Sequence, residues 1–278
     1  MVKFGVISWV WFYPFNPGAV FRAEEAGFDG LEIPVEDPKI LDGKKIVEAL
    51  NSSKIECSSI CGVLSPDRDI KSDDKAVREK AKEYIKSCVD FAVDFGCKIV
   101  GGPLYSAVGP TLTIPDKEKE WRIAVKELKD VAGYAEDNNI CLALEPINRF
   151  ENHLVNTVAE ALKMMGEINS PSVKIHFDTF HANIEEKSIG EAIKACGGNL
   201  VHFHSCENDR GTPGTGHIPW SEVAEALKAI KYDGYMVIET FQPGIKEIAV
   251  AASIWRPLAP SQDSLARDGL KFLKALMK

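Results

Sequence analysis

The sequence predicts an α/β protein built as one closed (β/α)8 barrel that spans residues 1–278 as a single domain. Short apolar runs alternate with longer amphipathic runs along the whole chain. The apolar runs lack polar alternation, which is typical of parallel strands covered by helices on both faces. No linker rich in Pro, Gly or Ser interrupts the alternation, and a barrel of this kind has about 250 residues.

Eight strands and eight helices are expected in strict alternation. The strands are expected at residues 4–8, 30–33, 55–61, 98–101, 141–145, 173–178, 200–204 and 235–239. The helices are expected at 18–26, 44–52, 74–95, 116–138, 157–168, 189–195, 221–230 and 264–277. Ser72 or Asp73 is predicted to cap the third helix and Gly96 to end it. A doubly wound open sheet is the competing fold, but it usually carries G-x-G-x-x-G after its first strand, and this motif is absent.

Composition argues against several classes of function. The formal net charge is -8 and the isoelectric point about 5.4, which argues against a nucleic-acid partner. The 7 cysteines contain no C-x-x-C pair, a pattern that favours reduced thiols in a cytoplasmic protein over a disulfide framework. No apolar run reaches about 18 residues, so no membrane span is expected.

Four consecutive expected strands each end on a residue that can bind a metal. These strands end "LALE", "IHFD", "HFH" and "MVIE", at Glu145, Asp178, His204 and Glu239. Catalytic side chains of such barrels lie at the carboxyl ends of the strands, and successive strands are neighbours. One charged strand end is usually a residue leaving the core for water, but four adjacent ends of compatible type predict a shared site. Three carboxylates and one imidazole suit Mn²⁺, Mg²⁺ or Co²⁺.

Other polar residues near these strand ends allow two interpretations each. His181 faces a substrate or caps a loop carbonyl, and Arg210 binds a ligand or is solvated. The loop with Gly211, Gly214 and Gly216 cradles a phosphate or forms a flexible turn, and the turn is favoured because G-K-[ST] is absent. Glu32 is a candidate for the pocket rim. The early aromatic residues Trp9, Trp11, Phe12, Tyr13 and Phe15 line a sugar pocket or belong to the core.

Four segments together resemble one family. "EPINRFENHLVNT", "FDTFHANIEE", "HFHSCENDRGTPGTGHIPW" and "VIETF" are similar to the ketose 3-epimerases, the D-tagatose and D-psicose (allulose) 3-epimerase group of the xylose-isomerase-like TIM barrels. The resemblance implies an isomerase that inverts C3 of free ketoses such as D-tagatose, D-psicose, D-fructose or L-ribulose through a metal-stabilised cis-enediolate. It implies that Mn²⁺, or Co²⁺ or Mg²⁺, binds Glu145, Asp178, His204 and Glu239, and that Glu145 and Glu239 also form the acid/base pair.

The resemblance further implies substrate contacts at Glu151, His181 and Arg210 and a homodimer or homotetramer. The chain departs from the group around "GGPLYSAVGP", where Ala107 and Val108 stand in place of an aromatic residue, and this leaves the preferred ketose open. An aldose–ketose isomerase and a phosphosugar epimerase of the same fold remain alternatives. An apurinic endonuclease would need more histidines and a basic surface, and a non-catalytic sugar-binding protein would not need the glutamate pair.

Overall fold

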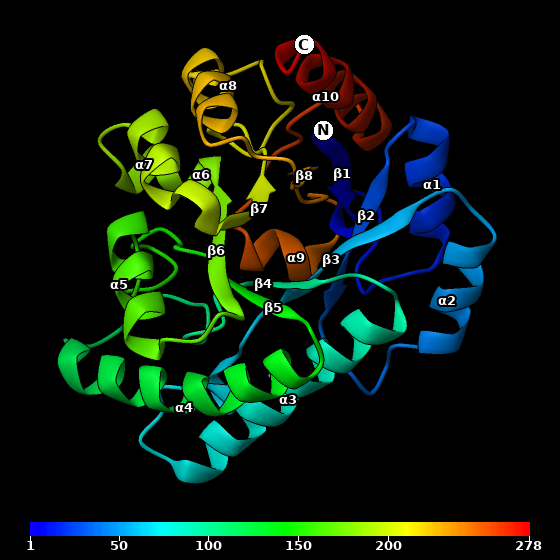
Figure 1. The fold of residues 1–278 in the computed structure, drawn as a ribbon. Helices are drawn as coiled ribbons and strands as arrows, with labels where there is room; N and C mark the ends of the chain where they lie inside the picture. The colour runs from blue at the N-terminus through cyan, green and yellow to red at the C-terminus, as the bar shows by residue number, and fades with distance from the viewer.

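The computed structural model describes residues 1–278 and confirms the predicted barrel. Eight parallel strands close into one ring in chain order, with β8 paired to β1. Figure 1 shows the helices arranged around this ring. The strands are β1 Lys3–Ile7, β2 Gly30–Val35, β3 Glu56–Gly62, β4 Ile99–Gly102, β5 Cys141–Leu144, β6 Val173–Asp178, β7 Leu200–His204 and β8 Tyr235–Ile238.

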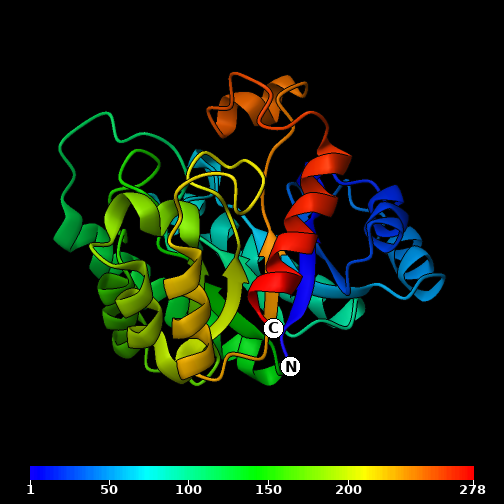
Figure 2. The same cartoon turned by 90° about the horizontal axis from the view of Figure 1, so that it is seen from above.

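The outer helices follow the expected alternation. They are α1 Gly18–Ala26, α2 Gly43–Asn51, α3 Lys75–Asp94, α4 Lys117–Asp137, α5 Val158–Ile168, α7 Ile189–Cys196, α8 Trp220–Ala229 and α10 Gln262–Leu276. The last helix, α10, packs against β1 and α1, which places the two ends of the chain near each other at one end of the barrel (Figure 2). None of the helices is both long enough and apolar enough to cross a bilayer.

The alternation of side chains along β6 and β7 explains why polar residues sit inside two strands. His176 pairs in register with His202, and Asp178 pairs with His204. Since successive side chains point to opposite faces, these four residues share the barrel interior. Phe177 and Phe203 lie between them in sequence and stack on each other with ring centroids 5.5 Å apart. The strand sequences "IHFD" and "HFH" therefore place histidine and aspartate inside and phenylalanine outside.

Two short helices were not expected. The helix α6 (Thr179–Glu185) begins immediately after β6, and the side chain of Asp178 accepts a hydrogen bond from Phe180 N at its start. The helix α9 (Lys246–Ala251) lies in the segment after β8. In Figure 2 this orange segment lies at the end of the barrel opposite the chain termini. With 7 and 6 residues, α6 and α9 are too short to show a helical period in the sequence.

The predicted cap of the third helix is wrong by one or two residues. Asp74, rather than Ser72 or Asp73, is the N-cap of α3, and its side chain accepts from Ala76 N at 2.8 Å. Ser72 instead accepts a hydrogen bond from Asp74 N. The cysteines are all free thiols, in agreement with the absence of a disulfide framework.

Candidate active site

The structure brings the four predicted metal ligands together at the carboxyl ends of β5 to β8. Asp178 and His204 are the last residues of β6 and β7, and Glu145 and Glu239 directly follow β5 and β8. All four side chains are buried. The ring nitrogen Nδ1 of His204 lies 3.8 Å from Glu145 Oε1 and 3.4 Å from Glu239 Oε2. Ligand atoms of Asp178, His204 and Glu239 all lie within 4.8 Å of one another.

The donor set fits a divalent cation. His204 Nδ1 is buried and has no hydrogen-bond partner, whereas Nε2 of the same ring hydrogen-bonds Glu32 Oε1 at 2.8 Å. A histidine ligand of a metal commonly donates its other N–H to a carboxylate in this way. Burial alone would lower the pKa of His204, but the charges of Glu32 and Glu239 outweigh burial and raise it well above its ordinary value. The negative charges of Glu32 and Glu239 also favour a metal cation at Nδ1 of His204.

The prediction that Glu32 lies at the pocket rim is wrong. Glu32 is 1% exposed inside the barrel, because β2 continues for three residues beyond it to Val35. Its carboxylate accepts from Ser59 Oγ on β3 and hydrogen-bonds Nε2 of both His202 and His204. Glu32 therefore fixes the orientation of His204, a candidate metal ligand, by bonding the ring nitrogen opposite Nδ1.

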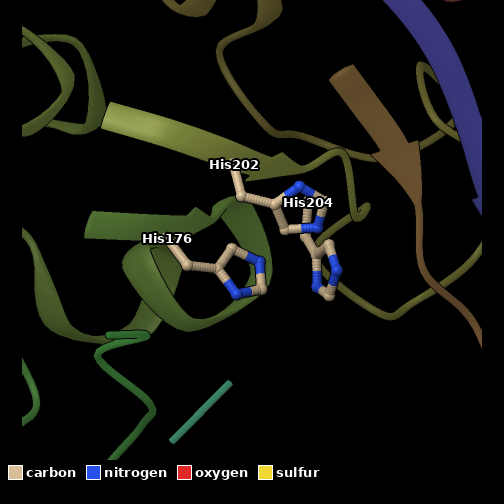
Figure 3. Close-up of side chains that lie close together, drawn as sticks. All are labelled: His176, His202 and His204. Carbon is tan, nitrogen blue, oxygen red and sulfur yellow. The ribbon is translucent and has the colours of Figure 1, made fainter. Parts of the chain in front are cut away.

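The side chains of His176, His202 and His204 lie close together in the barrel interior (Figure 3). The rings of His176 and His204 cross edge to face with centroids 4.1 Å apart, and those of His202 and His204 lie 5.1 Å apart. Gly101 on β4 leaves room for these side chains, since a Cβ atom there would come 3.1 Å from His176 Nδ1. His176 and His202 are buried in the barrel interior, and His176 Nδ1 lies 3.6 Å from Glu145 Oε2.

The environments of the two glutamates shift their pKa values in opposite directions. Burial raises the pKa of Glu145 well above its ordinary value, and the charges of Glu239 and Asp178 add to this rise. Burial acts in the same direction on Glu239, but the charges of Arg210 and His204 outweigh it and lower that pKa. Burial also raises the pKa of Asp178, to about 6. Two carboxyl groups with separated proton affinities are suited to acid and base roles in one reaction.

His181 and Glu151 are held beside this pair by Asn148. The backbone N–H of Asn148 donates to His181 Nδ1 at 3.1 Å, and Arg210 Nη2 lies 3.2 Å from His181 Nε2. That Nε2 atom is 3.9 Å from Glu145 Oε1 and 3.8 Å from Asp178 Oδ2. The side-chain amide of Asn148 donates to Glu151 Oε1 at 2.8 Å. His181 lies on α6 rather than in a loop, and its Nε2 atom faces the carboxylates and Arg210.

Arg210 is buried rather than solvated. Its Nη1 donates to Asp178 Oδ2 at 3.0 Å and to Glu239 Oε2, and its guanidinium lies 4.1 Å from the centroid of the Phe180 ring. The backbone of Arg210 has φ 64°, a left-handed conformation that side chains other than glycine adopt rarely. Such local strain is common at functional sites, and here it turns the guanidinium toward the carboxylates.

The glycine loop after β7 is organised by a buried carboxylate. Glu207 is fully buried and accepts from Gly214 N at 2.8 Å, Ile218 N at 3.0 Å and Trp220 Nε1 at 2.9 Å. The amide groups of this loop are therefore occupied by an anionic side chain of the protein itself. A phosphate would meet the negative charge of Glu207 there, so the loop is a poor phosphate cradle.

A cavity of about 270 Å³ opens onto the site. Its reacting end contains Glu145, Glu239 and the three predicted substrate contacts Glu151, His181 and Arg210. Its walls include Ile248, Ala251 and Ala252 from α9 and the turn that ends it, together with Trp9, Tyr13 and Val108. Of the early aromatic residues, Trp9 and Tyr13 thus line the cavity. Trp11 instead donates through its indole N–H to Asp263 on α10.

Sequence reasoning did not assign a role to three residues that the structure places at the site. Asn148 orients both His181 and Glu151, and Glu36 and Arg68 line the cavity after β2 and β3. Asn148 was detectable as a polar residue close behind Glu145. Glu36 and Arg68 stand among many other charged residues, and nothing in their spacing distinguishes them.

Comparisons with known proteins agree with this geometry. Residues 20–276 match the family model described as xylose isomerase-like TIM barrel. The chain is 31% identical over 279 residues to a ketose 3-epimerase of Arthrobacter globiformis, covering 98% of this chain and 96% of that protein. It is 32% identical over 279 residues to an L-ribulose 3-epimerase of Mesorhizobium japonicum, covering 98% and 93%.

A solved structure shows the same fold over the full length. The crystal structure of D-psicose 3-epimerase with D-tagatose from Clostridium cellulolyticum H10 superposes with a TM-score of 0.94 at 29% identity, covering 100% of both chains. The resemblance inferred from the motifs is therefore confirmed. The chain belongs to the xylose isomerase-like TIM barrels and, within them, to the ketose 3-epimerases, which are carbohydrate epimerases of the isomerase class.

Proposed function

We propose that the protein is a metal-dependent enzyme that inverts the configuration at C3 of free ketoses. The observation that carries the proposal is the placement of Glu145 and Glu239, which approach one ring nitrogen of His204 from β5 and β8 at the same cavity. The relative named for L-ribulose and the D-psicose 3-epimerase solved with D-tagatose support ketoses as the substrate class.

In this proposal Glu145 and Glu239 exchange the C3 proton with opposite faces of the sugar. The strands that carry them, β5 and β8, stand three positions apart in the ring, so the two carboxyl groups approach from different sides. One carboxylate removes the proton and the other carboxylic acid returns a proton to the opposite face. A single base would tend to restore the starting configuration. General acid–base help of this kind contributes on the order of 10²–10⁴ in rate.

Glu145, Asp178, His204 and Glu239 would hold the cation, and Mn²⁺ is the proposed ion, with Co²⁺ and Mg²⁺ as alternatives. When bound, a divalent ion supplies Lewis-acid stabilisation of negative charge on the ketose oxygens. The carboxylates and the imidazole of this set are ligands that such ions accept. Glu32 and Ser59 would keep the His204 ring in place during loading, since Glu32 bonds the far nitrogen of that ring.

Glu151, His181 and Arg210 are proposed to bind the C1–C2 end of the sugar. The guanidinium of Arg210 is a donor, Glu151 is an acceptor, and His181 presents its Nε2 atom, all at the reacting end of the cavity. Fixed donors and acceptors of this kind hold the reacting carbon between the two glutamates, which lowers the entropic part of the barrier.

The test is incubation of metal-stripped protein with D-fructose, D-tagatose, D-psicose or L-ribulose, with and without added Mn²⁺. Chromatography should show the C3 epimer of at least one ketose, only when the metal is present. An aldose product would instead favour an aldose–ketose isomerase. Turnover restricted to phosphorylated sugars would favour a phosphosugar epimerase.

Three further expectations from the sequence belong to this proposal. We propose that residues 1–278 act as one domain, that the protein works in the cytoplasm with reduced thiols, and that it forms a homodimer or homotetramer. The free state of every cysteine is consistent with a reducing compartment. Size-exclusion chromatography with light scattering tests the assembly.

A further inference from the structure

A second group of polar residues lines the same cavity across the barrel mouth from the reacting end. Glu36 directly follows β2, and Arg68 ends the short 3₁₀ helix Pro66–Arg68 that follows β3. In the closed ring of eight strands β2 stands four positions from β6, so Glu36 is opposite Asp178 at the end of β6. If C3 of a linear sugar lies between Glu145 and Glu239, its remaining carbons lie in the same cavity as Glu36.

Glu36 has hydrogen-bonding capacity that the protein does not use. Its Oε1 accepts from the indole N–H of Trp9 at 2.9 Å, and its Oε2 is buried without a hydrogen-bond partner. An ionised carboxylate offers about four acceptor positions. Burial raises the pKa of Glu36, and the hydrogen bond from Trp9 opposes that rise. A partly buried carboxylate with free acceptor positions is satisfied by hydroxyl donors of a ligand.

Arg68 is held mainly by backbone carbonyls, and its Nε is buried without a hydrogen-bond partner. Its Nη2 donates to the backbone carbonyls of Glu36 and Val63, at 2.7 and 3.2 Å. Its guanidinium stacks 3.9 Å from the centroid of the Tyr84 ring. These contacts join the segments after β2 and β3 and fix the backbone from which the Glu36 side chain projects. The carboxylate of Glu36 is thus the acceptor available at this end of the cavity.

We propose that Glu36 is a specificity-determining residue that receives the terminal hydroxyl groups of the ketose and rejects ketoses that carry a phosphate or carboxylate at that end. The proposal rests on the proposed function, because it requires C3 to lie between Glu145 and Glu239. A hydroxyl donates a charge-assisted hydrogen bond to the carboxylate, whereas a terminal phosphate meets a like charge. The loop after β7, whose amides are occupied by Glu207, offers no alternative phosphate cradle.

The experiment compares kcat/KM for D-fructose, 6-deoxy-D-fructose and D-fructose 6-phosphate in the Mn²⁺-loaded wild type, E36A and E36Q at pH 8. E36A should lose roughly tenfold to a hundredfold on D-fructose, the value of a hydrogen bond to a charged group, and less than about threefold on the 6-deoxy sugar. E36Q keeps an acceptor and removes the charge. In this variant the kcat/KM for D-fructose 6-phosphate, divided by that for D-fructose, should therefore rise at least about tenfold over the wild type. The exposed Glu48 on α2 supplies the matched control E48Q, which should leave every ratio unchanged.

The possible results separate failure of the inference about Glu36 from failure of the proposed C3 inversion. If the wild type turns over D-fructose but E36A affects the 6-hydroxy and 6-deoxy sugars equally, Glu36 does not read the terminal hydroxyl and the inference is wrong. A wild type that prefers the 6-phosphate also overturns the inference, while C3 inversion itself stands. A wild type inactive on every ketose overturns the proposed function, and the inference with it. Equal thermal midpoints of E36Q and wild type show that the effects are not due to misfolding.

Discussion

His204 Nε2 lies 2.8 Å from Glu32 Oε1 in the barrel interior, and this contact turns the opposite nitrogen of the ring toward Glu145 and Glu239. Glu32 also bonds His202 and Ser59, so one buried carboxylate joins β2, β3 and β7. The geometry of the candidate metal site is therefore set by residues that do not themselves face the cavity.

Replacing Glu32 by glutamine should weaken metal binding. The amide removes the negative charge that supports the His204 ring, and loss of such a supporting contact typically costs about 10- to 100-fold in metal affinity. Titration of metal-free protein with Mn²⁺ by calorimetry measures the dissociation constant directly. E48Q serves as the control for charge, and an unchanged affinity in E32Q would show that Glu32 is only a core residue.

Replacing Glu145 or Glu239 by glutamine should abolish epimerisation without unfolding the barrel. Each substitution removes one proton-transfer group, which is expected to lower kcat by about 10²–10⁴. The double variant should be little worse than either single variant, since both act in one step. Steady-state assays with circular dichroism as the folding check measure this. Normal activity in either single variant would refute the acid/base assignment.

Replacing Arg210 by lysine should lower kcat/KM by at least about tenfold, because an ammonium cannot reproduce a planar guanidinium that stacks on Phe180 while its Nη1 contacts Asp178 and Glu239 and its Nη2 contacts His181. The matched control is R256K, since Arg256 is exposed and pairs with Asp209 outside the cavity. Kinetics of both variants with one ketose give the comparison. Equal losses in the two variants would argue against a specific role for Arg210.

Glu127 links α4 to α3 through Arg78 at 3.1 Å and Lys82 at 3.0 Å. Burial acts to raise the pKa of Glu127, but these two cations outweigh it and lower the pKa. The stabilisation is therefore present above the unfolded-state pKa and lost as the pH falls through the folded-state pKa. E127Q should cost about 1 kcal/mol near pH 7, because water still reaches the pair, and progressively less toward pH 3.

Urea denaturation of wild type and E127Q at several pH values measures this difference. E79Q is the matched control, because the Glu79–Lys82 pair is more exposed and should contribute less. A difference between wild type and E127Q that grows toward acid pH would contradict the sign of the pKa shift.

The barrel and its four candidate metal ligands were predictable because each depends on a local sequence pattern, an apolar run that ends on a polar residue. The strand ends at Glu145, Asp178, His204 and Glu239 follow apolar runs, and barrel topology alone brings consecutive strands together. The roles of other residues depend on which way a side chain points. Glu32 was misplaced because the length of β2 beyond it decides whether it lies at the rim or inside.

Residues that act through contacts distant in sequence were not predictable at all. Glu36 lies across the cavity from Asp178 because β2 stands opposite β6 in the ring. Arg68 fixes the backbone around Glu36 by donating hydrogen bonds to carbonyl groups of two different segments. The helix α6 was missed because it begins directly at the end of β6, where Asp178 serves as both cap and candidate ligand. These features arise from tertiary packing rather than from periodicity.

The most direct test of C3 inversion by Glu145 and Glu239 is deuterium incorporation from D₂O into a ketose, followed by NMR, with Mn²⁺-loaded wild type, E145Q and E239Q. We expect deuterium at C3 together with the C3 epimer for the wild type, and no epimer for either variant. Deuterium at C1 or C2 with an aldose product, or epimer formation that persists in E145Q and E239Q, would contradict it.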